Sequence, residues 1–376
     1  MATLVAFLTW LPAVCWIGLL LLPWRPWLNG ETLAEADHGA EDFDHSLLTV
    51  LIPARNEAEV IAATLESIAD QGEALKVILV DDGSSDGTAD VARTVTRVDL
   101  TVIDGEPLPS GWSGKLWALE QGIQGVRTPY TLLLDADIRL APGVLAALMQ
   151  RARAECRQFL SVMASLRMES FWEKLLMPAF IHFFKLLYPF RLANSANPRF
   201  SAAAGGCILL ETRLIREIGG FGAIRGSIID DCSLARKVKA LGASTWIGQS
   251  HGVVSLRAYP DLQSVWDMVA RTAYTQLRYS PLLLVLCSVV MLAMFWLPLA
   301  GLLAPAYRLP SGLALAGMLI AYLPTLSYYR KSPLWALAMP AIAGLYLAMT
   351  WSSALRYWRG EASRWKARVY AADTIS

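Results

Sequence analysis

Charged side chains are scarce in this sequence. Asp, Glu, Lys and Arg together make up 17% of the 376 residues, whereas 55% of the residues are hydrophobic and the formal net charge is +1. A chain this apolar does not remain disordered in water. A nearly neutral chain also lacks the basic surface that is typical of nucleic-acid-binding proteins. We therefore expect a folded protein without a nucleic-acid partner.

Cysteine offers neither a disulfide framework nor a metal site. The count is odd, and no two cysteines have the spacing of metal ligands. We interpret them as unpaired, buried thiols in a reducing compartment. The cysteines are Cys15, Cys156, Cys207, Cys232 and Cys287.

Basic residues are absent from the beginning of the chain. Residues 3–22 contain no charged side chain and are long enough to cross a bilayer, and Arg25 follows them. A signal peptide is the alternative interpretation, but it normally begins with a basic segment. The pattern favours a membrane anchor at residues 1–28 with its carboxyl side in the cytoplasm.

Three more apolar stretches occur late in the chain, near residues 282–304, 312–328 and 333–351. Each contains prolines, so we expect kinked or broken helices. If all three crossed the membrane, the basic tail at residues 356–376 would lie outside, against the positive-inside rule. We therefore predict two to three spans within residues 281–355, with one stretch re-entrant or interfacial.

Strand-like and helix-like segments alternate after an acidic linker at residues 29–46. This alternation predicts an α/β fold with a mostly parallel sheet and right-handed crossovers. Asn56 and Glu59 have the spacing of a capping box for the first helix. The expected strands are 47–53, 75–81, 100–103 and 132–135, and the expected helices are 56–69, 86–95, 114–126 and 142–155.

The pattern changes after residue 159. Residues 171–190 are mostly apolar but carry several charges, which favours an interfacial helix over the alternative, a buried core helix. We expect a strand at 201–210, a helix at 230–241 that Gly242 ends, and a membrane-proximal helix at 261–280.

Polar side chains follow three of the predicted strands. Arg55 and Glu57 follow the first, Asp81 and Asp82 follow the second, and Asp135 and Asp137 follow the fourth. Parallel strands end at one edge of the sheet, which is where such sheets bind ligands. Arginine suits phosphate, and an Asp-x-Asp pair suits a divalent cation that holds a diphosphate. Each motif alone also fits an ordinary turn, but their alignment predicts a site for a nucleotide diphosphate.

Taken together, these motifs resemble those of family 2 glycosyltransferases with the GT-A (Rossmann-like) fold. The resemblance covers residues 47–260. The arrangement of an anchor before this region and spans after it is similar to that of ceramide glucosyltransferases. Residues 111–119 and 268–276 are most similar to the hopanoid-biosynthesis-associated glycosyltransferases. The motifs that carry the family resemblance are Ile52–Glu57, Val80–Ser84, Gly114–Leu119, Asp135–Asp137 and Asp230–Lys237.

The resemblance implies roles for individual residues. Asp231 would be the general base, and Asp137, assisted by Asp135, would ligate Mg²⁺ or Mn²⁺. We also expect the amino terminus of its helix to favour the ionised form of Asp231. The implied nucleotide-sugar site comprises Pro53, Arg55, Glu57, Asp81, Asp82, Lys115, Asp135, Gly205, Gly206, Asp230 and Arg271.

Several alternatives stay open at this point. Lys115 also fits a solvated lysine in the first turn of a helix, and Gly205 with Gly206 fits tight strand packing. His251 is a candidate late metal ligand, although a structural histidine is the favoured interpretation. Of the Gln-x-x-Arg-Trp signature of processive relatives, this sequence matches only the arginine, at Arg271.

The resemblance implies inverting, metal-dependent transfer of a sugar from a nucleotide-diphosphate donor, with a UDP-sugar expected, to a lipid hydroxyl. We expect a multi-pass protein of the cell inner membrane with a cytoplasmic catalytic domain. The alternatives are a processive polysaccharide synthase and a catalytically idle scaffold of the same fold in a membrane assembly.

Overall fold

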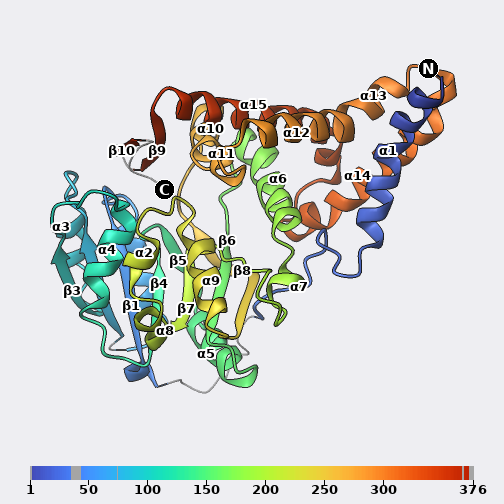
Figure 1. Cartoon of the computed structure of the whole chain (residues 1–376). Coiled ribbons are helices and arrows are strands. Elements are labelled where there is room, and N and C mark those ends of the chain that lie inside the picture. Colours follow the sequence, from blue (N-terminus) through green and yellow to red (C-terminus); the bar gives the residue numbers. More distant parts are fainter. Residues whose placement is uncertain (1, 35–43, 74, 366–367, 372–376) are drawn as a thin grey trace. The chain divides into compact units, whose positions relative to one another are not determined.

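The computed structural model describes residues 2–34, 44–73, 75–365 and 368–371 (Figure 1). The chain divides into two compact units, which we call the sheet unit and the helical unit. The sheet unit comprises the described parts of Glu31–Arg167, Leu192–Ala258 and Ser363–Ser376. The helical unit comprises the described parts of Met1–Gly30, Met168–Arg191 and Tyr259–Ala362. Half of the predicted acidic linker, residues 35–43, lies outside the described residues.

The sheet unit is built on an eight-stranded sheet in the order β3-β2-β1-β4-β7-β6-β8-β5. Strands β3, β2, β1 and β4 are parallel, β6 is parallel to β8, and the remaining contacts, those of β7 and β5, are antiparallel. The predicted α/β fold with a mostly parallel sheet is therefore confirmed. The strands are β1 Leu48–Ala54, β2 Lys76–Asp81, β3 Asp99–Asp104, β4 Tyr130–Leu134, β5 Ile138–Leu140, β6 Phe159–Ser165, β7 Cys207–Glu211 and β8 Thr245–Ser255.

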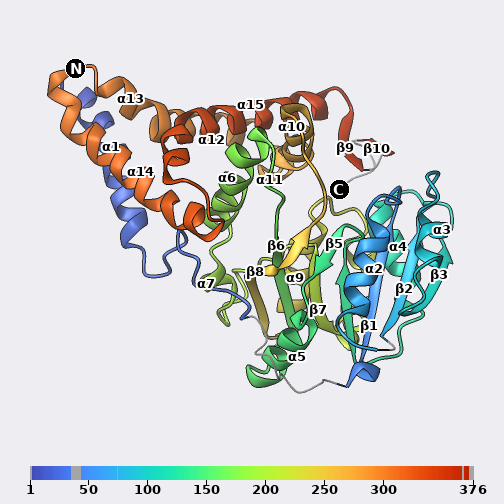
Figure 2. The same cartoon turned by 180° about the vertical axis from the view of Figure 1, so that it is seen from behind.

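Helices cover both faces of this sheet, as the opposite views in Figures 1 and 2 show. Alternate residues of a strand point to opposite faces, so Val50 and Ile52 of β1 join one hydrophobic cluster and Leu51 joins the other. Burial on both faces explains why the strands are short, continuous apolar runs. The helices of the first cluster are α2 Ile61–Ala69, α3 Thr88–Arg93 and α5 Val144–Ala154. Those of the second are α4 Gly114–Ile123, α8 Thr212–Glu217, the 3₁₀ turn η2 Phe221–Ile224 and α9 Asp230–Ala240.

Two local predictions are wrong. Helix α2 begins at Ile61, and its cap Val60 makes no side-chain capping bond, so Asn56 and Glu59 do not form a capping box. Asn56 instead has a positive φ of 50° and accepts a hydrogen bond from the Ser85 amide at 2.9 Å. Of the five cysteines, Cys15 and Cys156 are exposed rather than buried.

The helical unit contains three helices that are long and apolar enough to cross a membrane: Pro281–Gly301, Pro305–Tyr328 and Pro333–Trp358. The first has a π-helical turn at Leu292–Trp296, which fits the expected irregularity. How many of the three cross a membrane stays a prediction. The predicted helix 261–280 is interrupted at Arg271 and Thr272. The helices of this unit, including those within the three long apolar stretches, are α1 Ala2–Leu21, α6 Phe171–Leu187, α10 Leu262–Ala270, α11 Ala273–Gln276, α12 Pro281–Met291, α13 Leu297–Gly301, α14 Arg308–Tyr328 and α15 Met339–Trp358.

The polar residues of α6 lie inside the helical unit. His182 and Lys185 are fully buried. The Lys185 ammonium donates to the Thr325 hydroxyl at 3.0 Å and to the Asn29 side chain, while the His182 ring packs edge-on against Tyr322 at 5.1 Å. This burial matches the alternative of a core helix, and contact of α6 with a membrane surface stays a prediction. At the other end of the chain, β9 Glu361–Trp365 and β10 Arg368–Ala371 pair within the predicted basic tail.

Candidate functional site

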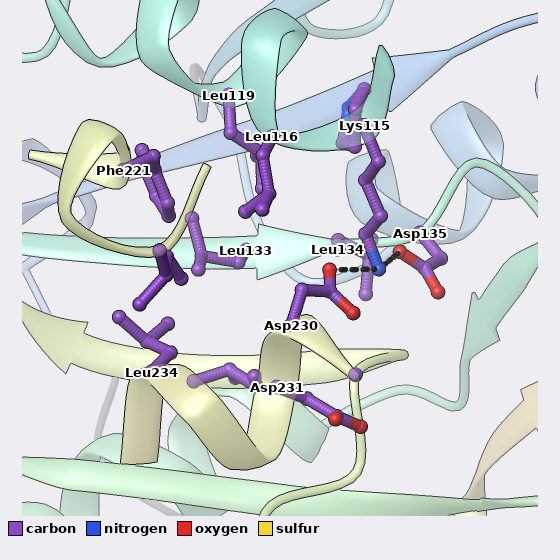
Figure 3. Close-up of a pocket in the computed structure, with 14 residues that line it drawn as sticks. Lys115, Leu116, Leu119, Leu133, Leu134, Asp135, Phe221, Asp230, Asp231 and Leu234 are labelled. Carbon is purple, nitrogen blue, oxygen red and sulfur yellow. Dashed lines mark ion pairs between the residues drawn. The ribbon is translucent and has the colours of Figure 1, made fainter. Parts of the chain in front are cut away.

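A pocket opens at the carboxyl end of β4 in the sheet unit (Figure 3). Four ionisable side chains meet there: Lys115, Asp135, Asp230 and Asp231. They come from the first turn of α4, the end of β4 and the first turn of α9. The remaining lining residues are mostly apolar: Pro53, Leu116, Leu119, Leu133, Leu134, Gly205, Ile208, Phe221, Ile224 and Leu234.

Lys115 connects two of these carboxylates. Its Nζ lies 2.7 Å from Asp135 Oδ1 and 3.5 Å from Asp230 Oδ2, as the dashed lines in Figure 3 mark. Burial lowers the pKa of Lys115, but the charges of Asp135 and Asp230 outweigh that effect and raise it above the usual value. Because Lys115 is held in the pocket with 21% of its side chain exposed, it is not the solvated lysine of the alternative interpretation.

Asp135 is fixed by the sheet as well as by Lys115. Its amide donates to the Gly206 carbonyl at 3.0 Å, which ties the end of β4 to the start of β7. Burial raises the pKa of Asp135, and the nearby Lys115 charge opposes that rise. Its side chain is 32% exposed to the pocket, so solvent there screens part of the ion pair.

Asp231 differs from Asp230 in its surroundings. Its Oδ1 accepts a hydrogen bond from the Cys232 amide at 2.7 Å. Burial, followed by the charge of Asp230, raises the pKa of Asp231 to about 7, and the Cys232 hydrogen bond and the Lys115 charge offset only part of the rise. The Cys232 amide in the first turn of α9 lowers the pKa of Asp231, in the expected direction, but desolvation and the like charge of Asp230 outweigh it.

Gly205 and Gly206 have different reasons to be glycine. A Cβ at Gly205 would lie 3.3 Å from Lys115 Nζ, which would have to shift slightly, and 3.4 Å from Asp231 Oδ2, which it would touch. A Cβ at Gly206 would instead lie 3.1 Å from Ile138 Cδ1. Gly206 therefore fits the alternative of tight packing, whereas Gly205 shapes the pocket.

Arg55, Asp81 and Asp82 join the ends of β1 and β2. Arg55 donates to the Asp82 carbonyl and lies 3.5 Å from the buried Asp82 carboxylate. Asp81 Oδ1 accepts a hydrogen bond from the Ser84 amide at 3.1 Å, and the Ser84 hydroxyl accepts one from the Asn56 amide at 2.9 Å. These bonds hold two of the polar strand ends together, as their predicted alignment requires.

Arg257, which the motifs did not single out, reaches the Asp-x-Asp segment. Its Nε lies 2.7 Å from Asp137 Oδ2, and its Nη2 lies 2.7 Å from Glu57 Oε1. The guanidinium thus joins the residues that follow β1 and β4. The signal that could have found it is a basic residue directly after the last apolar strand.

The oxygen ligands of Asp135 and Asp137 fit a hard divalent cation such as Mg²⁺ or Mn²⁺. Such ions take one or two protein carboxylates and complete their shell with water and substrate phosphates. In the described parts of the chain, no three His, Cys, Asp or Glu side chains converge as a metal site. His251 is an exposed residue within β8, so a third protein ligand from this histidine is not supported. Phosphate oxygens would have to complete the shell.

Arg271 belongs to a different unit from the other predicted site residues. It ends α10 in the helical unit, whereas the remaining predicted residues lie in the sheet unit. Its role in donor binding stays a prediction.

Comparison with known proteins gives a family match and a fold match. Residues 49–219 match the family model described as Glycosyl transferase family 2. A 4,4'-diaponeurosporenoate glycosyltransferase of Staphylococcus aureus (strain USA300) is 36% identical over 121 residues, which are 32% of this chain and 30% of that protein. The protein of the same name from strain N315 is 39% identical over 121 residues, again 32% of this chain and 30% of its own length. The matched segment is thus less than a third of each curated relative.

A solved structure with a similar fold is that of the mannosyltransferase PcManGT from Pyrobaculum calidifontis, in complex with GDP-Man and Mn²⁺. The sequence identity is 18%, the TM-score is 0.53, and the superposition covers 93% of this chain and 98% of that one. This likeness confirms the predicted GT-A fold. The match to the family 2 model is confined to residues 49–219, so this region is similar to the domains of that family.

Proposed function

We propose that this protein transfers a sugar from a nucleotide-diphosphate donor to a lipid hydroxyl, with inversion and with a divalent metal, at the cytoplasmic face of the cell inner membrane. The glycosyltransferase domain supports the reaction class. The curated relatives are named for a carotenoid, which supports a lipid-like acceptor. Three helices long enough to span a bilayer support action at a membrane. We propose a UDP-sugar as donor and a hopanoid or another polyprenoid lipid as acceptor.

The observation that carries this proposal is the contrast between Asp231 and the other carboxylates of the site. Asp135 and Asp230 pair with Lys115, and the remaining carboxylates that follow β1, β2 and β4 also have basic or hydroxyl partners. For Asp231, the described part of the chain shows no ion pair. A carboxylate with a pKa of about 7 accepts a proton well at neutral pH, so Asp231 is the general base that the pocket supports best.

In the proposed step, the acceptor hydroxyl oxygen forms a bond to the anomeric carbon of the sugar and gives its proton to Asp231. The bond between that carbon and the phosphate oxygen breaks, and the nucleoside diphosphate leaves with the electron pair. Displacement on the side opposite the leaving group inverts the configuration. The metal, held by Asp137 and Asp135, would supply positive charge beside the leaving diphosphate. The Lys115 ammonium lies in the same pocket and would attract the phosphates.

The test uses the full chain, purified in detergent and incubated with a membrane lipid extract and radiolabelled UDP-sugars or GDP-mannose. We expect the wild type to move label into the lipid fraction. Asp231→Asn should lower the rate by about 10²–10⁴-fold, the range typical for loss of a positioned base. Glu217→Gln, which alters an exposed ion pair with Arg213, is the matched control and should keep the wild-type rate.

An Asp231→Asn protein with the wild-type rate would refute the assignment of the base. Nucleotide binding without transfer to any lipid would instead support the idle scaffold. The anomeric configuration of the product, measured by NMR, tests inversion directly. A polymeric rather than a single-sugar product would support a processive synthase.

A further inference from the structure

The guanidinium of Arg257 lies between two carboxylates at the edge of the sheet. It is 2.7 Å from Asp137 Oδ2 through Nε and 2.7 Å from Glu57 Oε1 through Nη2. Both carboxylate side chains are only 11% exposed, whereas that of Arg257 is 36% exposed. Arg257 therefore provides the positive charge that lets two poorly hydrated carboxylates lie at the same edge.

The sheet itself sets this position. Strand β5 pairs antiparallel with β8, with Ile138 opposite Ser255. One step further, the Leu256 amide donates to the Asp137 carbonyl at 2.8 Å. Backbone pairing thus brings Arg257 beside Asp137. Both residues lie just outside the strands, Arg257 after β8 and Asp137 before β5, so the paired strands bring their backbones together.

A positive charge in this place opposes metal binding. A divalent cation would have to share Asp137 with a guanidinium that already bonds to one of its oxygens, and like charges repel at this distance. The other carboxylate of the motif has a similar partner, since Lys115 Nζ lies 2.7 Å from Asp135 Oδ1. In the part of the chain that the structure describes, no three His, Cys, Asp or Glu side chains are placed to hold a metal ion.

We propose that Arg257 is a resident cation of the Asp-x-Asp site that weakens metal binding to the free protein. This inference rests on the proposed function, in which the metal acts on a nucleotide-diphosphate sugar. The two negative charges of the diphosphate, and its oxygen ligands, outweigh the repulsion from Arg257. Metal binding then depends on the donor, and Arg257 is a positioning residue that sets this dependence.

Electron paramagnetic resonance of free Mn²⁺ tests the proposal without any transfer reaction. The full chain in detergent is titrated with Mn²⁺ alone and with Mn²⁺ plus UDP. For the wild type we expect weak binding without UDP and clearly tighter binding with it. Arg257→Gln should tighten binding of Mn²⁺ alone by about five- to tenfold, as expected for loss of one charge beside a divalent ion in a partly hydrated site.

Two variants serve as controls. Arg257→Lys keeps the charge and should stay close to the wild type, whereas Arg213→Gln removes a basic residue that pairs with Glu211 and Glu217 and should change nothing. Equal or weaker binding of Mn²⁺ alone to a folded Arg257→Gln protein would overturn the proposal. Stoichiometric, tight Mn²⁺ binding to the wild type without UDP would also overturn it. This measurement uses only the wild type, so it does not depend on whether a variant folds.

The outcome is separable from that of the proposed function. If the wild type transfers sugar but Arg257→Gln leaves the Mn²⁺ affinity unchanged, only the role of Arg257 fails. If the wild type binds no UDP and transfers no sugar, the proposed function fails.

Discussion

Asp231 determines the pH dependence that we expect for sugar transfer. Burial and the neighbouring Asp230 charge raise its pKa to about 7, and only the ionised carboxylate can accept the proton of the acceptor hydroxyl. With one such group, the rate should be about one tenth of its plateau at pH 6 and about nine tenths at pH 8. The rate therefore rises with pH through neutrality.

Replacing Asp230 by Asn tests the cause of this behaviour. A unit charge on the order of 6 Å away, at an effective dielectric constant of about 40–80, contributes ~0.7–1.4 kcal/mol. That corresponds to about 0.5–1 pH unit. The substitution also releases Lys115 from one of its two partners, which leaves more of its charge to stabilise ionised Asp231. Both effects move the midpoint of the pH profile to lower pH.

The assay is the initial rate of transfer to lipid at saturating donor, measured from pH 5.5 to pH 9 in overlapping buffers. Glu217→Gln removes an exposed carboxylate and should leave the midpoint unchanged. A rate that is constant between pH 6 and pH 8 would show that Asp231 is not the base. A midpoint that moves upward in Asp230→Asn would show that the charge of Asp230 does not raise the pKa of Asp231.

Two further predictions concern close packing. Gly205→Ala should lower the transfer rate by about tenfold with little change in the thermal midpoint, because the new methyl displaces Lys115 Nζ slightly and touches Asp231 Oδ2. Gly30→Ala, where a Cβ meets nothing within 4 Å, is the control. Equal rates for the Gly205→Ala and wild-type proteins would contradict the argument. His182→Phe should stabilise the protein by about 1 kcal/mol, because no described residue bonds to either ring nitrogen of this buried histidine while the edge-on contact with Tyr322 is kept. Thermal unfolding in detergent measures the second effect, and a lower midpoint than that of the wild type would count against it.

The sheet and its polar edge could be predicted because both follow from local patterns. Apolar runs of strand length are buried on both faces, and the residues directly after them must lie at the edge where parallel strands end. Arg55, Asp82 and Asp135 therefore lie close to where the sequence places them. The antiparallel strand β7 was less accessible to prediction, because its partners are chosen by tertiary packing rather than by its own pattern.

Arg257 illustrates what local patterns miss. Histidine is a common metal ligand, so the sequence favours His251 over Arg257 as a candidate at this end of the sheet. The side chain that reaches Asp137 is selected by the register of β5 against β8, which pairs residues more than a hundred positions apart. The predicted capping box at Asn56 is wrong for a related reason. Its spacing from Glu59 fits a cap, but the Asn56 side chain instead accepts a hydrogen bond from the Ser85 amide, which follows the next strand.

The roles of Asp230 and Asp231 depend on the directions in which their side chains point rather than on the residue type, which is the same. Adjacent residues of a helix point about 100° apart, so two neighbouring carboxylates at the start of α9 cannot face the same partner. Asp230 turns toward Lys115, as Figure 3 shows, and its negative charge is compensated. Asp231 turns toward Gly205, where a Cβ would lie 3.4 Å from its Oδ2, and its pKa is about 7. Two identical neighbouring residues thus differ in role: Asp230 pairs with Lys115, whereas burial and the charge of Asp230 give Asp231 the raised pKa that suits a proton acceptor.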